Sequence, residues 1–396
     1  MFRTLEVLGP EHEYALVDGE LQALPVVDQV IRAYRGRIVN VVSLNGYSLG
    51  KELQAHVAEL KANTPFRSPV VFEEEMYRGV QEVTAFVARK FEAQLLGTGM
   101  HPLLRVGDAQ VWSHRGRQLF AVLDRLFNLQ QHGWLNIQSF QLNLSYGSEA
   151  EAVRLHNGVA RLLPYLPAVA AASPVYDATV SEDLDSRLRF YWINQRAVPS
   201  ITGDVIPEDV ASFQEYRRRV IAQYSADLQR AGAPAWLLHR EWVNSRGAIF
   251  RFDRRALEIR IMDEQECIKA DVALSCFIRA CLRGLLLQNE PPVAHRCLVQ
   301  DLGAVIKAGL DAPVRHPWGP TARDVCVRYY RLAEAHASAE EKLYLPLVKT
   351  RIEGGNLANR IRRAIERRTQ KTDVPDAIVH VYLQLAECLT ANRLYT

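Results

Sequence analysis

Two glutamates near the start of the chain, Glu11 and Glu13, stand two positions apart in the segment GPEHEY. Residues 3–18 are predicted to form a β-strand, in which side chains at positions i and i+2 point to the same face. Two neighbouring carboxylates repel each other and are costly to bury. The pair therefore predicts a positive charge between them, and a bound metal ion would supply it.

Three further strand-like segments carry polar residues where apolar residues are expected. KELQAHVAELK contributes Glu52, Gln54, His56 and Glu59, SFQLNLS contributes Gln141 and Asn143, and EIRIMD contributes Glu258 and Arg260. Carboxylates on adjacent antiparallel strands could hold two or three ions such as Mg²⁺, which prefers oxygen ligands and shares its coordination with phosphates and water. Arg260, beside Glu258, could stabilise a phosphoryl group during transfer.

These residues also have plainer interpretations. Charged residues in strands most often lie on a solvated face, and Gln141 and Asn143 could form a hydrogen-bonded polar pair in the core. The recurrence of the pattern on four segments favours a shared site. The sequence contains no GxxxxGK[ST] or GxGxxG phosphate loop, no GxSxG elbow and no HExxH zinc motif that would offer a different chemistry.

The elements that must position these residues follow an α+β pattern. Helices are predicted over 24–35, 73–96, 115–132 and 148–173, and strands over 36–62, 134–146 and a hairpin at 248–263. Helices dominate from about residue 270, so an antiparallel sheet with flanking helices is expected rather than a βαβ repeat. An unbroken strand would place Glu52 and Glu59 on opposite faces, so a bulge is expected to bring both inward.

The composition excludes several other classes of protein. The 396 residues are 48% hydrophobic and 23% charged, with a net charge of +3, which is ordinary for a soluble protein and too small to indicate nucleic acid. Six scattered cysteines without a CxxC pair favour a reducing cytoplasm. Charges interrupt the first residues and the apolar stretch 270–287, which argues against a signal peptide and a membrane span. A homo-oligomer stays open.

In order and spacing these motifs resemble the glutamate–cysteine ligase family, specifically its GCS2-type carboxylate–amine ligases in the glutamine synthetase fold superfamily. GPEHEY resembles the family's G-x-E-x-E strand, and FQLNLSYGSEAEAVRLHN resembles its central strand and following helix. Gln141-x-Asn143 stands where many members carry H-x-H, and it is similar to the Q-x-N form of true glutamate–cysteine ligases. EWVNSRGAIFRFDRRALEIRIMDEQE resembles the stretch that holds the last metal glutamate and an arginine. The resemblance runs through most of residues 5–290.

The resemblance implies a glutamine synthetase-like antiparallel sheet with a metal-lined active-site face, flanking helices and a helical C-terminal part. We predict a catalytic domain over 1–290 and a helical extension over 291–396 packed on the same domain. In the implied reaction, ATP phosphorylates a carboxylate, in family members the γ-carboxylate of glutamate, and an amine attacks the acyl phosphate to give an amide. The expected partners are a small carboxylate and an amine, with two or three Mg²⁺ ions, or Mn²⁺, bringing carboxylate and phosphates together.

Mapped onto this sequence, the resemblance assigns a role to each polar residue. The expected metal ligands are Glu11, Glu13, Glu59 and Glu258, with Glu52 as a weaker candidate; Gln141 and Asn143 would lie where metal and nucleotide meet. Arg260 would contact phosphate. Arg187 or Arg189 in SEDLDSRLRFYWIN would hold a substrate carboxylate as a fork, and Arg246 is a further candidate for substrate or phosphate. A surface ion pair is the plainer alternative for these arginines.

Two other functions stay open on the sequence. The amine could belong to a peptide, a protein or a pathway intermediate, which would make the chain a tailoring ligase; the block EIRIMDEQEC, unlike the usual sequence of the Q-x-N branch, favours this. The chain could also be a non-catalytic member that binds nucleotide. The presence of every candidate metal carboxylate argues against that second alternative.

Overall fold

A single antiparallel sheet forms the centre of the molecule in the computed structural model, which describes residues 2–288 and 293–396. Its strands are β1 (Leu8–Val17), β2 (Val41–Ser43), β3 (Tyr47–Lys51), β4 (Val57–Ala62), β5 (Gln94–Leu96), β6 (Ser139–Ser145), β9 (Ala248–Arg251) and β10 (Ala256–Asp263). They run in the order β2-β3-β4-β1-β6-β10-β9, and β5 pairs with the end of β1. The predicted α+β class with an antiparallel sheet is confirmed.

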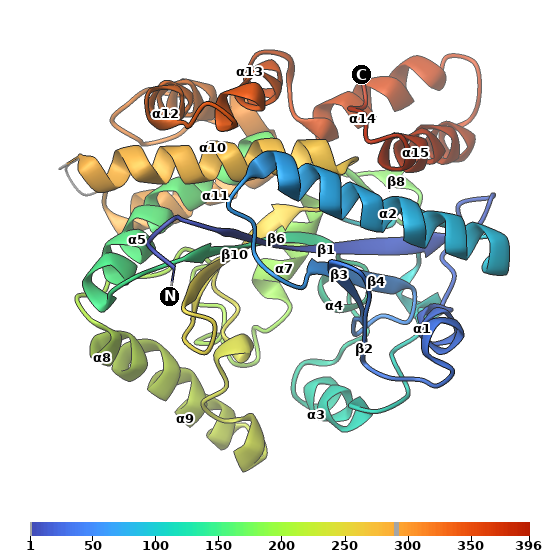
Figure 1. Cartoon of the computed structure of the whole chain (residues 1–396), viewed down its shortest axis with the longest axis horizontal. Coiled ribbons are helices and arrows are strands. Elements are labelled where there is room, and N and C mark those ends of the chain that lie inside the picture. The colour runs from blue at the N-terminus through green and yellow to red at the C-terminus, as the bar shows by residue number, and fades with distance from the viewer. Residues whose placement is uncertain (1, 289–292) are drawn as a thin grey trace.

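Helices cover the sheet on both faces (Figure 1). They are α1 (Val27–Arg35), α2 (Pro69–Phe91), α3 (Arg117–Phe127), α4 (His132–Leu135), α5 (Glu149–Leu162), α6 (Leu166–Ala170), α7 (Ser186–Ile193), α8 (Phe213–Tyr216), α9 (Ala222–Arg230), α10 (Ile268–Leu287), α11 (His295–Ala308), α12 (Ala322–His336), α13 (Leu345–Gly354), α14 (Leu357–Arg368) and α15 (Val374–Thr390). A small separate pair of strands is formed by β7 (Val175–Tyr176) and β8 (Thr179–Val180).

The sheet has one face packed against long helices and one face that lines a cavity. In Figure 1, α2 and α10 lie along the upper face, whereas α3, α8 and α9 lie below the sheet. The alternation of side chains along β1 follows this difference. His12 stacks on Phe140 and Tyr14 and lies beside Phe72 of α2 on the helix-covered face. Glu11 and Glu13 face the cavity on the other side.

Helices α12 to α15 form a further layer on the helix-covered face, whereas α11 packs on α6 and α7 (Figure 1). Helices α12 and α13 pack on α10, and α15 packs on β5 and α2. Side chains from α11, α12 and α13 share one buried cluster with the sheet. The predicted boundary between residues 290 and 291 lies outside the described residues. Within the described part of the chain, no helix is both long enough and apolar enough to cross a bilayer.

Local sequence signals account for several element ends. The turn predicted at Asn45-Gly46 joins β2 to β3, and Gly46 has a φ of +85°, which glycine adopts readily. The helix predicted over 148–173 is interrupted near Pro164 and Pro167, because proline removes a backbone donor and clashes with the preceding turn. Ser148 begins α5 with a capping box that it shares with Glu151.

Candidate active site

Five glutamates from separate parts of the chain line one cavity of about 340 Å³ beneath the sheet. They are Glu11 and Glu13 of β1, Glu59 of β4, Glu258 of β10, and Glu52 of the connection between β3 and β4. The five expected metal ligands are therefore brought together on one face of the sheet.

Strand register places these glutamates next to one another. Glu13 lies directly opposite Glu59 of the neighbouring strand β4. On its other side, β1 pairs with β6, and Glu11 lies opposite Gln141. Glu258 of β10 lies opposite Asn143 of β6. Since directly opposed residues of antiparallel strands project to the same face, three strand pairs carry their polar residues toward the cavity.

Glu52 reaches the cavity by a route that differs from the predicted one. The segment KELQAHVAELK is not a single bulged strand, because β3 ends at Lys51 and β4 begins at Val57. The chain reverses between them, so that Gly50 pairs with Glu59. Glu52 follows β3 directly and lines the cavity together with Glu59. The expectation of a bulge within one strand is wrong; a change of strand brings both carboxylates inward.

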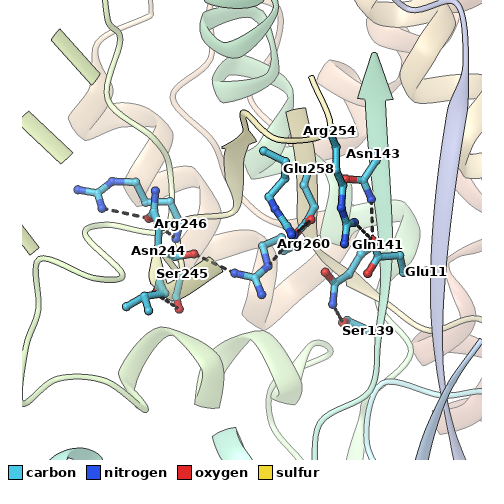
Figure 2. Close-up of polar contacts among 12 residues, drawn as sticks. Glu11, Ser139, Gln141, Asn143, Asn244, Ser245, Arg246, Arg254, Glu258 and Arg260 are labelled. Carbon is cyan, nitrogen blue, oxygen red and sulfur yellow. Dashed lines mark hydrogen bonds and ion pairs between the residues drawn. The ribbon is translucent and has the colours of Figure 1, made fainter. Parts of the chain in front are cut away.

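Glu11 carries its own counter-charge. Its Oε1 lies 2.6 Å from Nη1 of Arg254 and accepts a 3.1 Å hydrogen bond from Nδ2 of Asn143 (Figure 2). Burial alone would raise the pKa of Glu11, but Arg254 and Lys61 outweigh it and hold that pKa below its usual value. Glu11 is therefore ionised at neutral pH.

Three of the other cavity glutamates, Glu13, Glu52 and Glu59, have pKa values above their usual range. Burial, followed by repulsion from neighbouring carboxylates, raises the pKa of Glu13 and of Glu52 to about 7 and that of Glu59 to about 8. Lys61 Nζ lies 2.5 Å from Glu59. Within the described part of the chain, no basic side-chain nitrogen lies within 4.0 Å of the carboxylate of Glu13 or Glu52.

The oxygen donors fit a hard divalent cation. Glu13 already accepts hydrogen bonds from the backbone N–H of Ser139 at 2.7 Å and from Nε2 of Gln141 at 3.0 Å, which fix its orientation. Carboxylates that are buried, close together and short of counter-charge are the donors that Mg²⁺ or Mn²⁺ uses in proteins. The side chains of Glu13, Glu52 and Glu59 could thus hold such ions.

Three arginines stand at the same cavity, and two of them frame Glu258. Arg251 Nη1 lies 2.5 Å from Glu258 Oε2, and Arg260 Nε lies 3.2 Å from Glu258 Oε1. Arg260 also donates to the carbonyl of Asn244 at 2.8 Å, so its guanidinium is held between Glu258 of β10 and the segment that precedes β9 (Figure 2). The third is Arg187 of α7, which is buried and lies 2.5 Å from Asp263. Nη2 of Arg187 is buried without a hydrogen-bond partner among the described residues.

Two of the predicted arginines do not line this cavity. Arg189 has a side chain that is 61% exposed and points to Asp183, 4.0 Å away. Positions 187 and 189 lie about 200° apart around a helix, so only one of them can face the site. Arg246 is bound by Glu208 at 2.7 and 2.9 Å and lies away from Arg260 in Figure 2. Its neighbour Ser245 is the residue that lines the cavity.

Asn143 faces a second cavity and not the one that holds the five glutamates. It donates to Glu11 and to the carbonyl of Gly9, and it lines an adjacent cavity of about 440 Å³ that also contains Lys61, Asn63 and Arg254. Gln141 remains in the first cavity. The two amides therefore face two different cavities, and Glu11 lines both.

Sequence reasoning missed four cations of the site, namely Lys51, Lys61, Arg251 and Arg254. Lys61 offered a signal, because it stands two positions after Glu59 and must share its face within a strand. Arg251 ends β9, and Arg254 lies within the hairpin turn before Glu258. Their positions depend on the geometry of that hairpin, which the sequence does not specify.

The match to known sequences decides the family. Residues 7–378 match the family model of Glutamate-cysteine ligase family 2 (GCS2). The chain belongs to this family. The predicted resemblance is thereby confirmed, and the protein is an ATP-dependent ligase of the carboxylate–amine type. An uncharacterized protein of Archaeoglobus fulgidus is 44% identical over 389 residues, which cover 98% of this chain and the whole of that relative.

Solved structures share the fold at low sequence identity. A glutamate–cysteine ligase from Francisella tularensis in complex with AMP has a TM-score of 0.69 and 14% identity, covering 98% of this chain and 90% of that one. The ligase PafA, in complex with the prokaryotic ubiquitin-like protein Pup, has a TM-score of 0.54 and 11% identity, covering 99% of this chain and 74% of that one. These two likenesses show a common architecture.

Metal binding is expected to release protons near neutral pH. Glu13, Glu52 and Glu59 are partly protonated at pH 7, because their pKa values are about 7, 7 and 8, and an ion must displace those protons. Titration calorimetry with Mg²⁺ in two buffers of different ionisation enthalpy should show release of on the order of one proton and tighter binding from pH 6 to pH 8. The exposed control variant Glu74→Gln should behave as the parent. Heats that do not depend on the buffer would contradict this.

The metal-free protein is expected to lose stability as pH rises. The folded chain holds protons on Glu13, Glu52 and Glu59 at pH values where the unfolded chain, with carboxyl pKa values near 4.5, has released them. This contribution to the free energy of unfolding is complete below about pH 4.5 and lost as pH rises through about 8. Denaturant unfolding across this range should show the decline, and Mg²⁺ should reduce it. A Glu59→Gln variant with an unchanged slope would count against this explanation.

Proposed function

We propose that this protein activates the γ-carboxylate of glutamate as an acyl phosphate at the expense of ATP and transfers the acyl group to an amine. The observation that carries the proposal is the convergence of five glutamates and three arginines in one cavity. The reaction must bring a carboxylate to the phosphates of ATP, and both are anions. A site with closely spaced metal-binding carboxylates and separate guanidinium groups meets that requirement.

The reaction consists of two balanced steps. An oxygen of the substrate carboxylate bonds to the terminal phosphorus of ATP as the bond from that phosphorus to its bridging oxygen breaks, which releases ADP. The amine nitrogen then bonds to the acyl carbon, the bond from carbon to the phosphate oxygen breaks, and phosphate leaves with the electron pair. The amine loses a proton, and an amide results.

The glutamates would hold two or three Mg²⁺ ions, or Mn²⁺, which when bound neutralise the ATP phosphates and the substrate carboxylate. Glu13, Glu52 and Glu59 form the part of the site short of counter-charge, and Glu11 and Glu258 complete the ring of carboxylates. Ser139 and Gln141 orient Glu13 through two hydrogen bonds. The sheet therefore fixes the metal-binding groups before any substrate enters.

The three arginines would bind two different groups, a phosphoryl group and a carboxylate of the donor. Arg260 and Arg251 lie on either side of Glu258, where they would bind a phosphoryl group during its transfer. Arg187 would hold a carboxylate of the donor through its unpartnered Nη2, while Asp263 fixes the guanidinium from behind. Arg187 is buried, so that this contact would exclude water from the donor.

Two alternative functions are considered. One differs in the amine acceptor, and the other has no catalytic turnover. The fold is shared with PafA, whose solved complex contains the protein Pup, so an acceptor on a peptide or protein is the second candidate. A non-catalytic nucleotide-binding role fits the site less well, because all five carboxylates and three arginines are in place. Product analysis separates the three.

Removal of one cavity carboxylate is expected to suppress turnover. The change Glu13→Gln keeps the size of the side chain but removes its charge and one of its two acceptor oxygens, and it should lower ADP formation from Mg-ATP, glutamate and amine by about 10²- to 10³-fold. Glu74→Gln, an exposed position on α2, is the matched control. An unchanged rate in Glu13→Gln would refute the proposed role of the carboxylates.

The two arginines of α7 are expected to differ sharply. Arg187→Lys keeps a positive charge but loses the planar guanidinium that can donate two parallel hydrogen bonds to a carboxylate. The KM for glutamate should therefore rise by about 10- to 100-fold. Arg189→Lys should leave KM and kcat unchanged, because its side chain is largely exposed outside the cavity. Circular dichroism should show both variants folded. Equal effects of the two substitutions would contradict the assignment of Arg187.

A further inference from the structure

The cavity beneath the sheet has two chemically different halves. The glutamates and arginines described above lie on the sheet side. The other half is lined by apolar side chains of α3, of α4 and of the short 3-10 helix at Glu241–Val243, namely Leu119, Phe120, Leu123, Phe127, Trp134 and Trp242. An apolar wall of this size is not needed to bind ATP phosphates, glutamate or metal ions.

The apolar half is built as a fixed surface. The rings of Phe127 and Trp134 stack with their centroids 5.8 Å apart. Trp134 Nε1 donates to the backbone carbonyl of Asn194 at 3.1 Å, which sets the plane of the indole. Lys51 Nζ lies 4.2 Å from the centroid of Phe120. These contacts hold the rings in place at the edge of the carboxylate cluster.

Part of this apolar surface remains open. Leu119 and Trp134 are only partly buried, and Trp242 is 37% exposed. Apolar surface that faces a cavity gains free energy when an apolar ligand displaces the water from it. Ligand sites commonly combine such walls with a few polar groups that fix orientation. The wall therefore indicates that a substrate brings an apolar group into this half.

Two polar atoms at the same cavity have no partner within the described residues. Tyr191 Oη and Asn194 Oδ1 are buried and make no hydrogen bond, and both side chains belong to the cavity lining. Asn194 Nδ2 donates to the carbonyl of Gly133 at 2.6 Å, which leaves its Oδ1 as an acceptor. A buried acceptor without a donor is costly. The N–H group of an amine is a donor that Asn194 Oδ1 could accept.

The positive groups show which substrate belongs in the apolar half. Arg251 and Arg260 are paired with Glu258, and Arg187 is held 2.5 Å from Asp263 at the end of the same strand, β10. The guanidinium groups therefore lie with the glutamates, where the anionic donor and ATP belong. The adenine ring of ATP also needs an apolar surface, and the adjacent cavity that shares Glu11 offers one in Phe2, Val7 and Pro65 beside Lys61 and Arg254. With the adenine placed there, the apolar half of the first cavity is left for the amine.

We infer that the acceptor is a small primary amine that carries an aromatic or branched aliphatic group, rather than a cysteine-sized polar amino acid. This inference rests on the proposed function and specifies the acceptor of that same site. The amine nitrogen would lie near Asn194 at the boundary of the two halves. The apolar group would lie against Trp134, Trp242 and the cavity face of α3.

The test compares matched amines on the full-length protein. Ethylamine, isopentylamine, benzylamine, ethanolamine and cysteine are each supplied with Mg-ATP and glutamate, and ADP and amide product are measured. Each methylene buried against the wall contributes about fourfold in affinity. We expect kcat/KM for benzylamine and isopentylamine to exceed that for ethanolamine and cysteine by at least about 30-fold.

Two tryptophans of one segment provide the variant and its control. Trp242 lines the cavity, whereas Trp236 is 46% exposed and does not line it. Trp242→Ala should lower kcat/KM for benzylamine about tenfold and change that for ethylamine less than about twofold. Trp236→Ala should change neither. A tenfold loss for ethylamine as well would assign Trp242 to structure and overturn the argument from the wall.

The outcomes separate this inference from the proposed function. Efficient amide formation with cysteine or ethanolamine, insensitive to Trp242→Ala, would keep the ligase and overturn the apolar acceptor. If no amine yields ADP, the proposed function fails, and calorimetric binding of benzylamine decides the inference alone. If Trp242→Ala weakens the binding of benzylamine and Trp236→Ala leaves it unchanged, an apolar amine subsite is supported. If benzylamine does not bind in this way, the inference is overturned.

Discussion

The repulsion between buried carboxylates on one face of the central sheet is the constraint on which the rest of the structure depends. Glu13 and Glu59 lie directly opposite each other, and Glu11 and Glu52 lie in the same cavity. Such a cluster weakens a fold unless the surrounding structure holds it. The raised pKa values of Glu13, Glu52 and Glu59 are the direct sign of this cost.

Side chains on the opposite face of β1 hold this strand, and with it the carboxylate cluster, in place. Glu264 accepts the backbone N–H of Glu13 at 3.1 Å, and it also lies 3.2 Å from His12. Asp271 of α10 lies 3.5 Å from the same histidine. Burial raises the pKa values of Glu264 and Asp271 well above their usual range, which favours their uncharged forms. Although these three side chains are close enough to share an ion, their burial and hydrogen bonds fit a structural role that fixes β1.

The layered arrangement leaves one face of the sheet open to a cavity with two kinds of lining. Helices α2 and α10 bury one side of the sheet, and α12 and α13 pack on α10 (Figure 1). The other side is left for chemistry, with charged groups from strands and apolar groups from α3 and α4. Asp263, at the end of β10, anchors α7 to the sheet, because it fixes Arg187 of α7 and accepts from Ser173.

The periodicity of the sequence predicted the parts of the site that depend on local geometry. Alternation in a strand was enough to place Glu11 and Glu13 together, and the turn at Asn45-Gly46 follows from residue type. Glu52 was misplaced within a continued strand, because a reversal of the chain after Lys51 has no strong local signal. Nothing in the sequence sets which face of α7 meets the sheet, so Arg187 and Arg189 were equivalent candidates.

The apolar half of the cavity could not be predicted for a related reason. A stripe of Leu119, Phe120, Leu123 and Phe127 on one helix face predicts burial, and only tertiary packing shows that it borders a cavity. Arg251, Arg254 and Lys61 are similarly defined by their distances to glutamates across strands. Functional sites often place charged or polar residues where local propensity and hydrophobic periodicity would not predict them. Their geometry is therefore set by long-range contacts, which a sequence pattern does not reveal.

The most direct test of the central claim is to locate Mn²⁺ by anomalous scattering in crystals grown with Mn²⁺ and a non-hydrolysable ATP analogue. The repulsion between the cavity glutamates predicts anomalous peaks within coordination distance of Glu13 and Glu59, with phosphate oxygens of the analogue on the same ions. Peaks confined to His12, Glu264 and Asp271 on the other face, or no ordered ion beside Glu13, would contradict the claim.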